Sequence, residues 1–167
     1  MSSLAGKFLV ARTILQDASF RQSVVLVLQH NDAGAFGLVV NRAVTIEGLP
    51  FPVFAGGPCE SQGLLMLHGH AEWAESATEP PPKEVAPGVF LGDASCLSRL
   101  SDTATEPGLR YRIISGYAGW GPGQLESELA TGVWAIVSAT GQLLFDVPVD
   151  DLWYHLVPPT IPEPSLN

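Results

Sequence analysis

The chain has 167 residues, of which 46% are hydrophobic and 15% are charged, a charged fraction well below the usual value of about 25%. Its 17 acidic residues outnumber its 8 basic residues, and the net charge of −9 argues against direct binding to nucleic-acid phosphates or to an anionic membrane surface. Because the first residues lack the pattern of a signal peptide and no apolar run approaches the roughly 20 residues of a membrane span, we expect a cytoplasmic protein.

Strand-like segments dominate the first half of the chain. The run Ser23–His30 is β-branched and apolar without alternation, which predicts a strand buried on both faces. A Gly-containing turn follows and predicts a hairpin with Phe36–Asn41. Asp17 is placed to cap a short helix that runs through Arg21. The other predicted strands here are Phe8–Ala11, Pro52–Ala55 and Gly63–Leu67.

Helices are mixed among strands in the second half. Three consecutive prolines make Glu79–Gly88 an extended connection. Gly116–Gly123 is predicted to contain a Gly-rich aromatic loop before a helix that ends at Thr131, and Gln142–Phe145 is predicted to form a hairpin with Val133–Ser138. Further predicted elements are strands at Val89–Leu91 and Tyr111–Ser115, and helices at Ala94–Leu100 and Pro148–Leu156.

The order of these elements favours an α+β fold with a mostly antiparallel sheet. We expect one domain over residues 1–157. The proline-rich segment 158–167 has little to bury and is expected to be a disordered tail.

Motifs that carry a known chemistry are missing from the sequence. It has no Walker loop, no GxGxxG, no GxSxG, no HExxH and no EF-hand loop, so we predict no catalytic residues and no cofactor. His68 and His70 lie on the same side of an extended segment and could share a metal, but no third ligand is near in sequence. Cys59 stands next to Glu60, which is the wrong neighbour for a nucleophilic thiolate, and Cys96 is expected in the core.

A pocket for a small anionic or planar ligand is the most specific site that the residues suggest. Glycines, an amide, a guanidinium and aromatic rings would converge if the end of the Phe36–Asn41 strand met the two Gly-rich segments. The candidate residues are His30, Asn41, Arg42, Gly56, Gly57, Pro58, Tyr117, Trp120 and Gln124. Trp120 could instead fill the core, and the glycines could serve backbone geometry alone.

Several motifs resemble the AlgH/YqgE family of bacterial proteins, which are often described as transcriptional regulators. They are Gly6–Ala11, Gln29–Arg42, Gly56-Gly57-Pro58, Gly116–Glu128 and Gly132–Trp134. The resemblance covers nearly the whole chain and implies one α+β domain with a bifurcated, partly barrel-like sheet and short flanking helices. It implies no established reaction, cofactor or substrate. The resemblance implies a longer segment between the Asn-Arg and Gly-Gly-Pro motifs, where this chain has only the short loop Ala43–Val53.

Three functions follow from these observations. The first is a non-enzymatic regulatory protein that acts indirectly through a protein partner. The second is a small-ligand or nucleotide binder that uses the pocket described above. The third is a hydrolase or transferase that uses His30 with Asn41, Arg42 or Glu126, because histidine exchanges protons near neutral pH. A histidine that merely ends a buried strand is the simpler explanation of His30.

Overall fold

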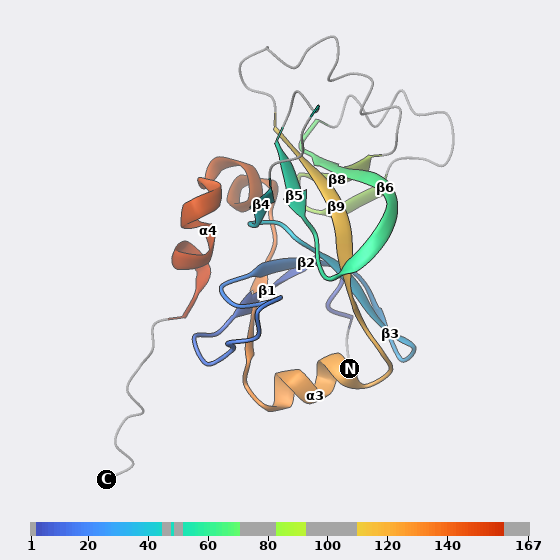
Figure 1. Ribbon diagram of the computed structural model, residues 1–167, viewed down its shortest axis with the longest axis vertical. Coiled ribbons are helices and arrows are strands. Elements are labelled where there is room, and N and C mark those ends of the chain that lie inside the picture. The colour runs from blue at the N-terminus through green and yellow to red at the C-terminus, as the bar shows by residue number, and fades with distance from the viewer. Residues whose placement is uncertain (1–2, 45–47, 49–51, 71–82, 93–109, 159–167) are drawn as a thin grey trace.

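The computed structural model describes residues 3–44, 48, 52–70, 83–92 and 110–158, and a strongly curled sheet dominates it (Figure 1). Ten strands and two α-helices lie within these ranges. The strands are β1 (Lys7–Ala11), β2 (Val24–Asn31), β3 (Gly34–Val39), β4 (Ala43–Val44), β5 (Val53–Ala55), β6 (Cys59–His68), β7 (Lys83–Ala86), β8 (Val89–Gly92), β9 (Tyr111–Trp120) and β10 (Trp134–Ser138). The helices are α3 (Gln124–Ala130), α4 (Val149–Leu156) and a short π-helical segment, η1 (Gln142–Asp146).

The strands follow the order β10-β1-β2-β3-β9-β6-β8-β7, with β5 also paired to β9 and β4 paired to β5. Every pairing is antiparallel except that of β5 with β9. The predicted α+β class with a mostly antiparallel, partly barrel-like sheet is therefore confirmed.

The long strand β9 changes partners along its length. Its residues Ile113–Ser115 pair with β5 on one edge and with β6 on the other, and Ala118–Trp120 pair with β3. Because β5 and β6 lie on opposite edges of the same residues, the connection Gly56–Pro58 must cross β9 between them. It does so against the backbone of Gly116 and Tyr117.

Two hydrophobic cores lie on the two faces of the sheet. Alternate residues of β2 point into different cores, Val24 and Leu26 into one and Val25 and Val27 into the other. This confirms that β2 is buried on both faces. Helix α4 covers the first core through Leu152 and Trp153, and α3 covers the second core through Leu125.

Four local predictions were wrong. Asp17 begins a hydrogen-bonded turn rather than a helix, because the chain reverses at Gln22, whose φ is +58°. Tyr117–Trp120 belong to β9 and not to a loop, since the sheet needs this strand to reach β3. Part of the connection expected over Glu79–Gly88 is a strand, Lys83–Ala86, which pairs with β8.

The fourth error is the hairpin expected at Gln142–Phe145. These residues form η1 instead, because Arg112 of β9 and Arg110, the residue just before β9, bind them. The guanidinium group of Arg112 donates to the carbonyl of Leu144 at 3.1 Å and lies 5.8 Å from the ring of Phe145. Arg110 pairs with Asp146 at 3.1 Å. Burial lowers the pKa of Arg112 from its usual value.

Some predictions lie outside the described residues. These are the helix at Ala94–Leu100, the position of Cys96 and nearly all of the tail 158–167. Among the residues that are described, no helix has the length and apolar character needed to cross a membrane.

The crossing at Gly57 gives a first test of the fold. A Cβ atom at this residue would lie 2.2 Å from the carbonyl oxygen of Tyr117, whereas a Cβ at Gly132 would meet nothing within 4 Å. Both residues have positive φ, so both alanine variants carry backbone strain, and only Gly57→Ala adds a clash with backbone. We expect Gly132→Ala to cost about 1 kcal/mol and Gly57→Ala about 3 kcal/mol or more, a fall in Tm of roughly 6–12 °C for the latter. Equal Tm values for the two variants would contradict the crossing.

Candidate functional site

Asn41 and Arg42, which follow β3, hold the Asp17–Gln22 turn in place. The Asn41 Oδ1 atom accepts a hydrogen bond from the backbone N–H of Val24 at 2.9 Å, and its Nδ2 donates to the carbonyl of Gln22 at 2.9 Å. The amide side chain thereby acts as a piece of backbone that joins β2 to the turn. It also supports the positive φ of Gln22, a conformation that costs a non-glycine residue about 1–3 kcal/mol.

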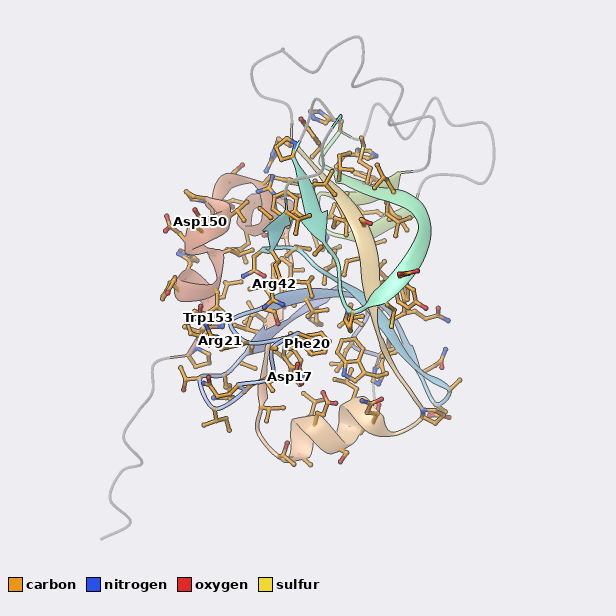
Figure 2. All side chains as sticks on the ribbon, in the orientation of Figure 1. Asp17, Phe20, Arg21, Arg42, Asp150 and Trp153 are labelled. Carbon is orange, nitrogen blue, oxygen red and sulfur yellow. The ribbon has the colours of Figure 1, made fainter. Side chains whose placement is uncertain are left out.

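The guanidinium group of Arg42 donates hydrogen bonds to several backbone carbonyls of the same turn; Figure 2 labels Arg42 beside it. It donates to Arg21 at 2.7 Å, to Ala18 at 3.4 Å, and to Ser19 through a shorter contact. A planar group with several donors in fixed directions suits this role, which an ammonium group could fill only in part. We call Asn41 and Arg42 the turn clamp.

A cavity of about 570 Å³ lies between the clamped turn and α4. Its size falls within the range of small-molecule sites, about 300–1,000 Å³. It is lined mainly by polar side chains, with two aromatic residues of α4: Gln16, Ala18, Arg21, Gln22, Asn41, Arg42, Val149, Asp150, Trp153 and Tyr154. Figure 2 places Arg21 on the turn and Asp150 and Trp153 on the neighbouring helix. This is the candidate site that the structure offers.

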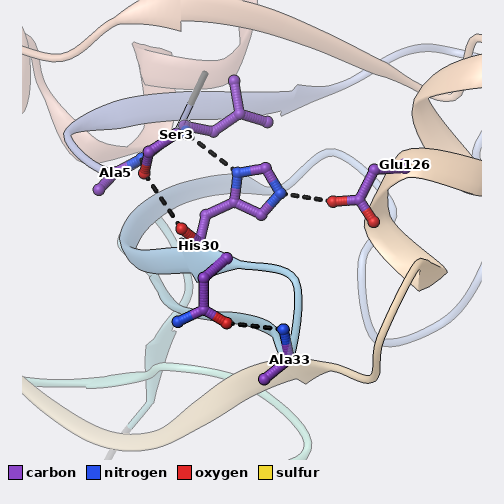
Figure 3. A network of polar contacts seen from close by, with 7 residues as sticks. Ser3, Ala5, His30, Ala33 and Glu126 are labelled. Carbon is purple, nitrogen blue, oxygen red and sulfur yellow. Dashed lines mark hydrogen bonds and ion pairs between the residues drawn. The ribbon is translucent and has the colours of Figure 1, made fainter. Parts of the chain in front are cut away.

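His30 lies in a separate polar network at the end of β2 (Figure 3). The backbone N–H of Leu4 donates to its Nδ1 at 3.0 Å, so we assign the proton of the neutral ring to Nε2. That nitrogen lies 2.5 Å from the Glu126 carboxylate. The side chain is only 4% exposed. Both ring nitrogens are therefore engaged, and His30 ties the N-terminal segment to α3 as a histidine at the end of a buried strand.

The carboxylate of Glu126 is affected by the same contact. The hydrogen bond from His30 lowers the pKa of Glu126 below its usual value of 4.5, with a further contribution from a backbone hydrogen bond. A cavity of about 510 Å³ opens beside this pair, lined by Ser3, His30, Asn31, Asp32, Gly123 and Glu126. The side chains around it supply carboxylates and no guanidinium or ammonium group.

Trp120 and Gln124 belong to a third group of polar contacts, which is centred on Glu128 of α3. The Glu128 Oε1 atom accepts hydrogen bonds from the indole N–H groups of Trp120 at 3.0 Å and Trp134 at 2.9 Å. Gln124 donates to the other carboxylate oxygen at 3.3 Å. Phe20 of the clamped turn stacks on Trp120 with ring centroids 6.0 Å apart. Trp120 is 5% exposed and fills the second core.

The nine candidate residues therefore do not share one pocket. Asn41 and Arg42 line the cavity beside α4, His30 lines another cavity, and Trp120 borders a third of about 210 Å³. The glycines Gly56 and Gly57 contact the backbone of β9, and Tyr117 packs on Phe36 with ring centroids 4.9 Å apart. Pro58 is exposed beside them.

The sequence did not point to the residues of α4 and of the turn that complete the cavity. Arg21, Gln22, Trp153 and Tyr154 carry no motif, and the cavity exists only because α4 packs near a turn far earlier in the chain. The one available signal was the rarity of basic residues, which makes Arg21 notable in so acidic a chain.

A metal site is not apparent among the described residues, where no group of three or more His, Cys, Asp or Glu side chains could hold an ion. The His68 Nδ1 atom accepts the backbone N–H of His70 at 3.2 Å, and His70 Nε2 accepts that of Arg110 at 2.9 Å. The two rings thus serve the backbone at the end of β6. Cys59 is a half-buried free thiol in the same strand.

Comparison with known proteins places this architecture in a family. The model of the AlgH-like family (DUF179) matches residues 8–159. A UPF0301 protein from Myxococcus xanthus is 36% identical over 92% of this chain and 88% of its own length. A UPF0301 protein from Hahella chejuensis is 31% identical, over 89% of this chain and 84% of its own.

Solved structures show the same fold. The solution structure of the AlgH protein from Pseudomonas aeruginosa superposes with a TM-score of 0.69 at 26% identity, covering 92% of this chain and 87% of that one. The crystal structure of protein DIP2367 from Corynebacterium diphtheriae gives a TM-score of 0.72 at 21% identity, covering 92% and 84%, which shows similarity of fold alone.

The turn clamp predicts a specific sensitivity at Arg42. We expect Arg42→Lys to lower the free energy of unfolding by about 1.5–3 kcal/mol, because one ammonium group cannot reach the three carbonyls that the guanidinium binds. Arg21→Lys is the matched control, since the Arg21 side chain is exposed, and it should change stability by about 0.5 kcal/mol at most. Denaturant unfolding measures both. Similar losses in the two variants would show that the clamp adds nothing.

The contact between His30 and Glu126 predicts a dependence on pH. A carboxyl whose pKa is lowered on folding stabilises the protein above its unfolded pKa, and this contribution disappears as the pH falls through the lower folded value. The difference in Tm between the wild type and Glu126→Gln should therefore be present at pH 6 and shrink toward pH 3. A difference that stays constant over this range would show that the ionised carboxylate does not matter.

Proposed function

The chain belongs to the AlgH-like family, and from that premise we propose that it is a non-enzymatic regulatory protein that acts through a protein partner. The observation that carries this proposal is that the polar side chains of the sequence motifs bind other parts of the protein itself. Both nitrogens of His30 hold backbone or carboxylate partners, and Asn41 and Arg42 are committed to the turn clamp. A hydrolase or transferase would have needed His30 for proton transfer and Asn41 or Arg42 to bind its substrate.

Glu126 and Glu128 support the same conclusion. The first binds His30, and the second binds the indole groups of Trp120 and Trp134. A general acid or base must reach a substrate proton within about 3 Å. Glu126 lines a cavity but shares its carboxylate with His30, and Glu128 lines none of the cavities described above. The polar groups of the motifs hold strands, turns and helices together, as in a scaffold that presents surfaces.

An open sheet edge is the surface best suited to a protein partner. Strand β10 ends the sheet order and pairs only with β1 among the described strands. Ile136, in its centre, is 48% exposed. Edge strands with free backbone groups readily accept an extended segment of another protein, and many proteins protect such edges with charge. We assign the partner contact to the β10 edge.

A capture experiment with matched variants tests the proposal. Ile136→Lys places a charge on the β10 edge, and Ile14→Lys places one at another exposed isoleucine, which is 66% exposed. From extracts of the source cells, we expect the wild type and Ile14→Lys to retain the same saturable partner and Ile136→Lys to lose it by at least about tenfold, which corresponds to about 1.4 kcal/mol. Both variants should keep the wild-type Tm.

Three results would contradict this function. The first is retention of the partner by Ile136→Lys, which would remove the β10 edge from the interaction. The second is turnover of ester or phosphoester substrates that His30→Gln abolishes, which would make the protein an enzyme. Binding to DNA in a gel shift at low salt, where phosphate contacts are strongest, would replace the indirect regulatory role with a direct one.

A further inference from the structure

The cavity beside α4 continues into a second, smaller one. This second cavity has a volume of about 240 Å³ and shares four residues with the larger cavity of about 570 Å³, namely Gln16, Arg21, Gln22 and Trp153. Arg12, Thr13 and Leu15 complete its lining. The two cavities therefore adjoin along the segment from Arg12 to Gln22, with Arg21 lining both.

The charge around these cavities is opposite to that of the molecule. Arg12, Arg21 and Arg42 line the pair of cavities, against the single carboxylate of Asp150. In a chain with 8 basic and 17 acidic residues, such a concentration of arginine makes a locally positive site.

The three arginines differ in what holds them. Arg42 donates to carbonyls of the turn, as described above. Arg12 and Arg21 are exposed, and within the described part of the chain no hydrogen bond or ion pair engages their guanidinium groups. Two guanidinium groups at one cavity match the oxygens of a phosphate or carboxylate in both charge and geometry.

The larger cavity adds an aromatic surface. The indole N–H of Trp153 is used, since it donates to the carbonyl of Ala11 at 2.7 Å. Tyr154 packs edge-on against Trp153, with ring centroids 5.0 Å apart and planes at 77°, and it remains 66% exposed. An exposed tyrosine ring at a cavity wall offers a face on which a planar ring can stack.

The backbone at the junction is held in an uncommon conformation. Gln22 is the only non-glycine residue with positive φ in the described ranges, and the Asn41 side chain fixes its carbonyl. Strained residues that the surroundings fix in this way are frequent at ligand sites, where they keep the site preformed.

We propose that this double cavity binds a nucleoside phosphate. The phosphate occupies the smaller cavity between Arg12 and Arg21, and the base stacks on Tyr154 in the larger one. Asp150, one turn before Tyr154 on α4, accepts a hydrogen bond from a hydroxyl or amino group of the nucleoside. The inference goes beyond the partner-binding role and stands independently of it, because it concerns a different surface and a small molecule.

Titration of the full-length protein with AMP, ADP, GMP and GDP tests this assignment, with inorganic phosphate, adenosine and a Glu-rich peptide as comparison probes. At about 100 times its dissociation constant, a nucleotide should raise Tm by several degrees. We expect binding to weaken with added salt, as contacts to a phosphate require.

Three variants distinguish a built site from general attraction of anions. Arg21→Gln should weaken nucleotide binding at least tenfold, and Tyr154→Ala should weaken it about fivefold or more while leaving the weak binding of inorganic phosphate unchanged. Lys7→Gln removes the same charge from β1, where Lys7 donates to Ser138 and lines neither cavity, and it should leave binding unchanged. Unliganded Tm values confirm that each variant is folded.

Several outcomes would overturn the proposal. These are no shift with any nucleotide at millimolar concentration, inorganic phosphate binding as tightly as a nucleotide, or equal weakening by Lys7→Gln and Arg21→Gln. Preference for the Glu-rich peptide over every nucleotide would also overturn it, since the cavity would then be a docking site for an acidic segment. None of these results bears on the β10 edge.

Discussion

The close approach of two backbone segments at Gly116 is the constraint on which the rest of this fold depends. On one edge, strand β9 pairs with β5 before this residue and with β3 after it, while β6 pairs with the other edge on both sides of it. The connection from β5 to β6 must cross at the same point, and a Cβ atom at Gly56 would lie 2.3 Å from the Gly116 carbonyl oxygen. One backbone contact thus explains Gly56, Gly57 and Gly116, because a side chain at any of them would collide with the other segment.

Polar motif residues serve backbone geometry in a similar way. Asn41 and Arg42 satisfy the carbonyls and the amide of a turn that lies about 20 residues earlier, and Glu128 joins the indole groups of a strand end and of β10. The backbone hydrogen bonds of the turn itself run from Phe20 and Arg21 to Asp17. Asn41 and Arg42 supply partners for other carbonyls of the turn. Of the arginines in the described ranges, Arg12 and Arg21 are not used in this way and face solvent.

The sequence predicted the elements that a local pattern of apolar, capping or acidic residues specifies. It missed the elements whose conformation depends on contacts with residues far away in the sequence. The apolar run of β2, the helix start after Gly123 and the acidic first turn of α4 are local signals, and they placed these elements correctly. The π-helical segment and the last residues of β9 depend on Arg112 and on β3, which local patterns do not reveal. The candidate site was missed in part for the same reason, because its cavity depends on two segments that are far apart in the sequence.

For the site, the sequence singled out Asn41 and Arg42 but assigned them the wrong neighbours. It joined them to Trp120 and the glycines, whereas the cavity that they line is closed by α4. Trp120 instead contacts the turn that Arg42 binds, since Phe20 of this turn stacks on the indole. Which segments pack together is a tertiary property, and amphipathic helices such as α4 do not encode the surface on which they pack.

The position of β1 also has a consequence for the order of folding. This strand lies between β2, its near neighbour in sequence, and β10, whose Ser138 pairs with Lys7. A ribosome that adds roughly 5–20 residues per second delivers β10 several seconds after β1 has emerged. During this time β1 can pair with β2 but not yet with β10. The hairpin of β2 and β3 therefore binds β1 before β10 is synthesised. Addition of β10 to the sheet is therefore a late event of synthesis, and a chain interrupted before Trp134 would expose the edge of β1 to other molecules.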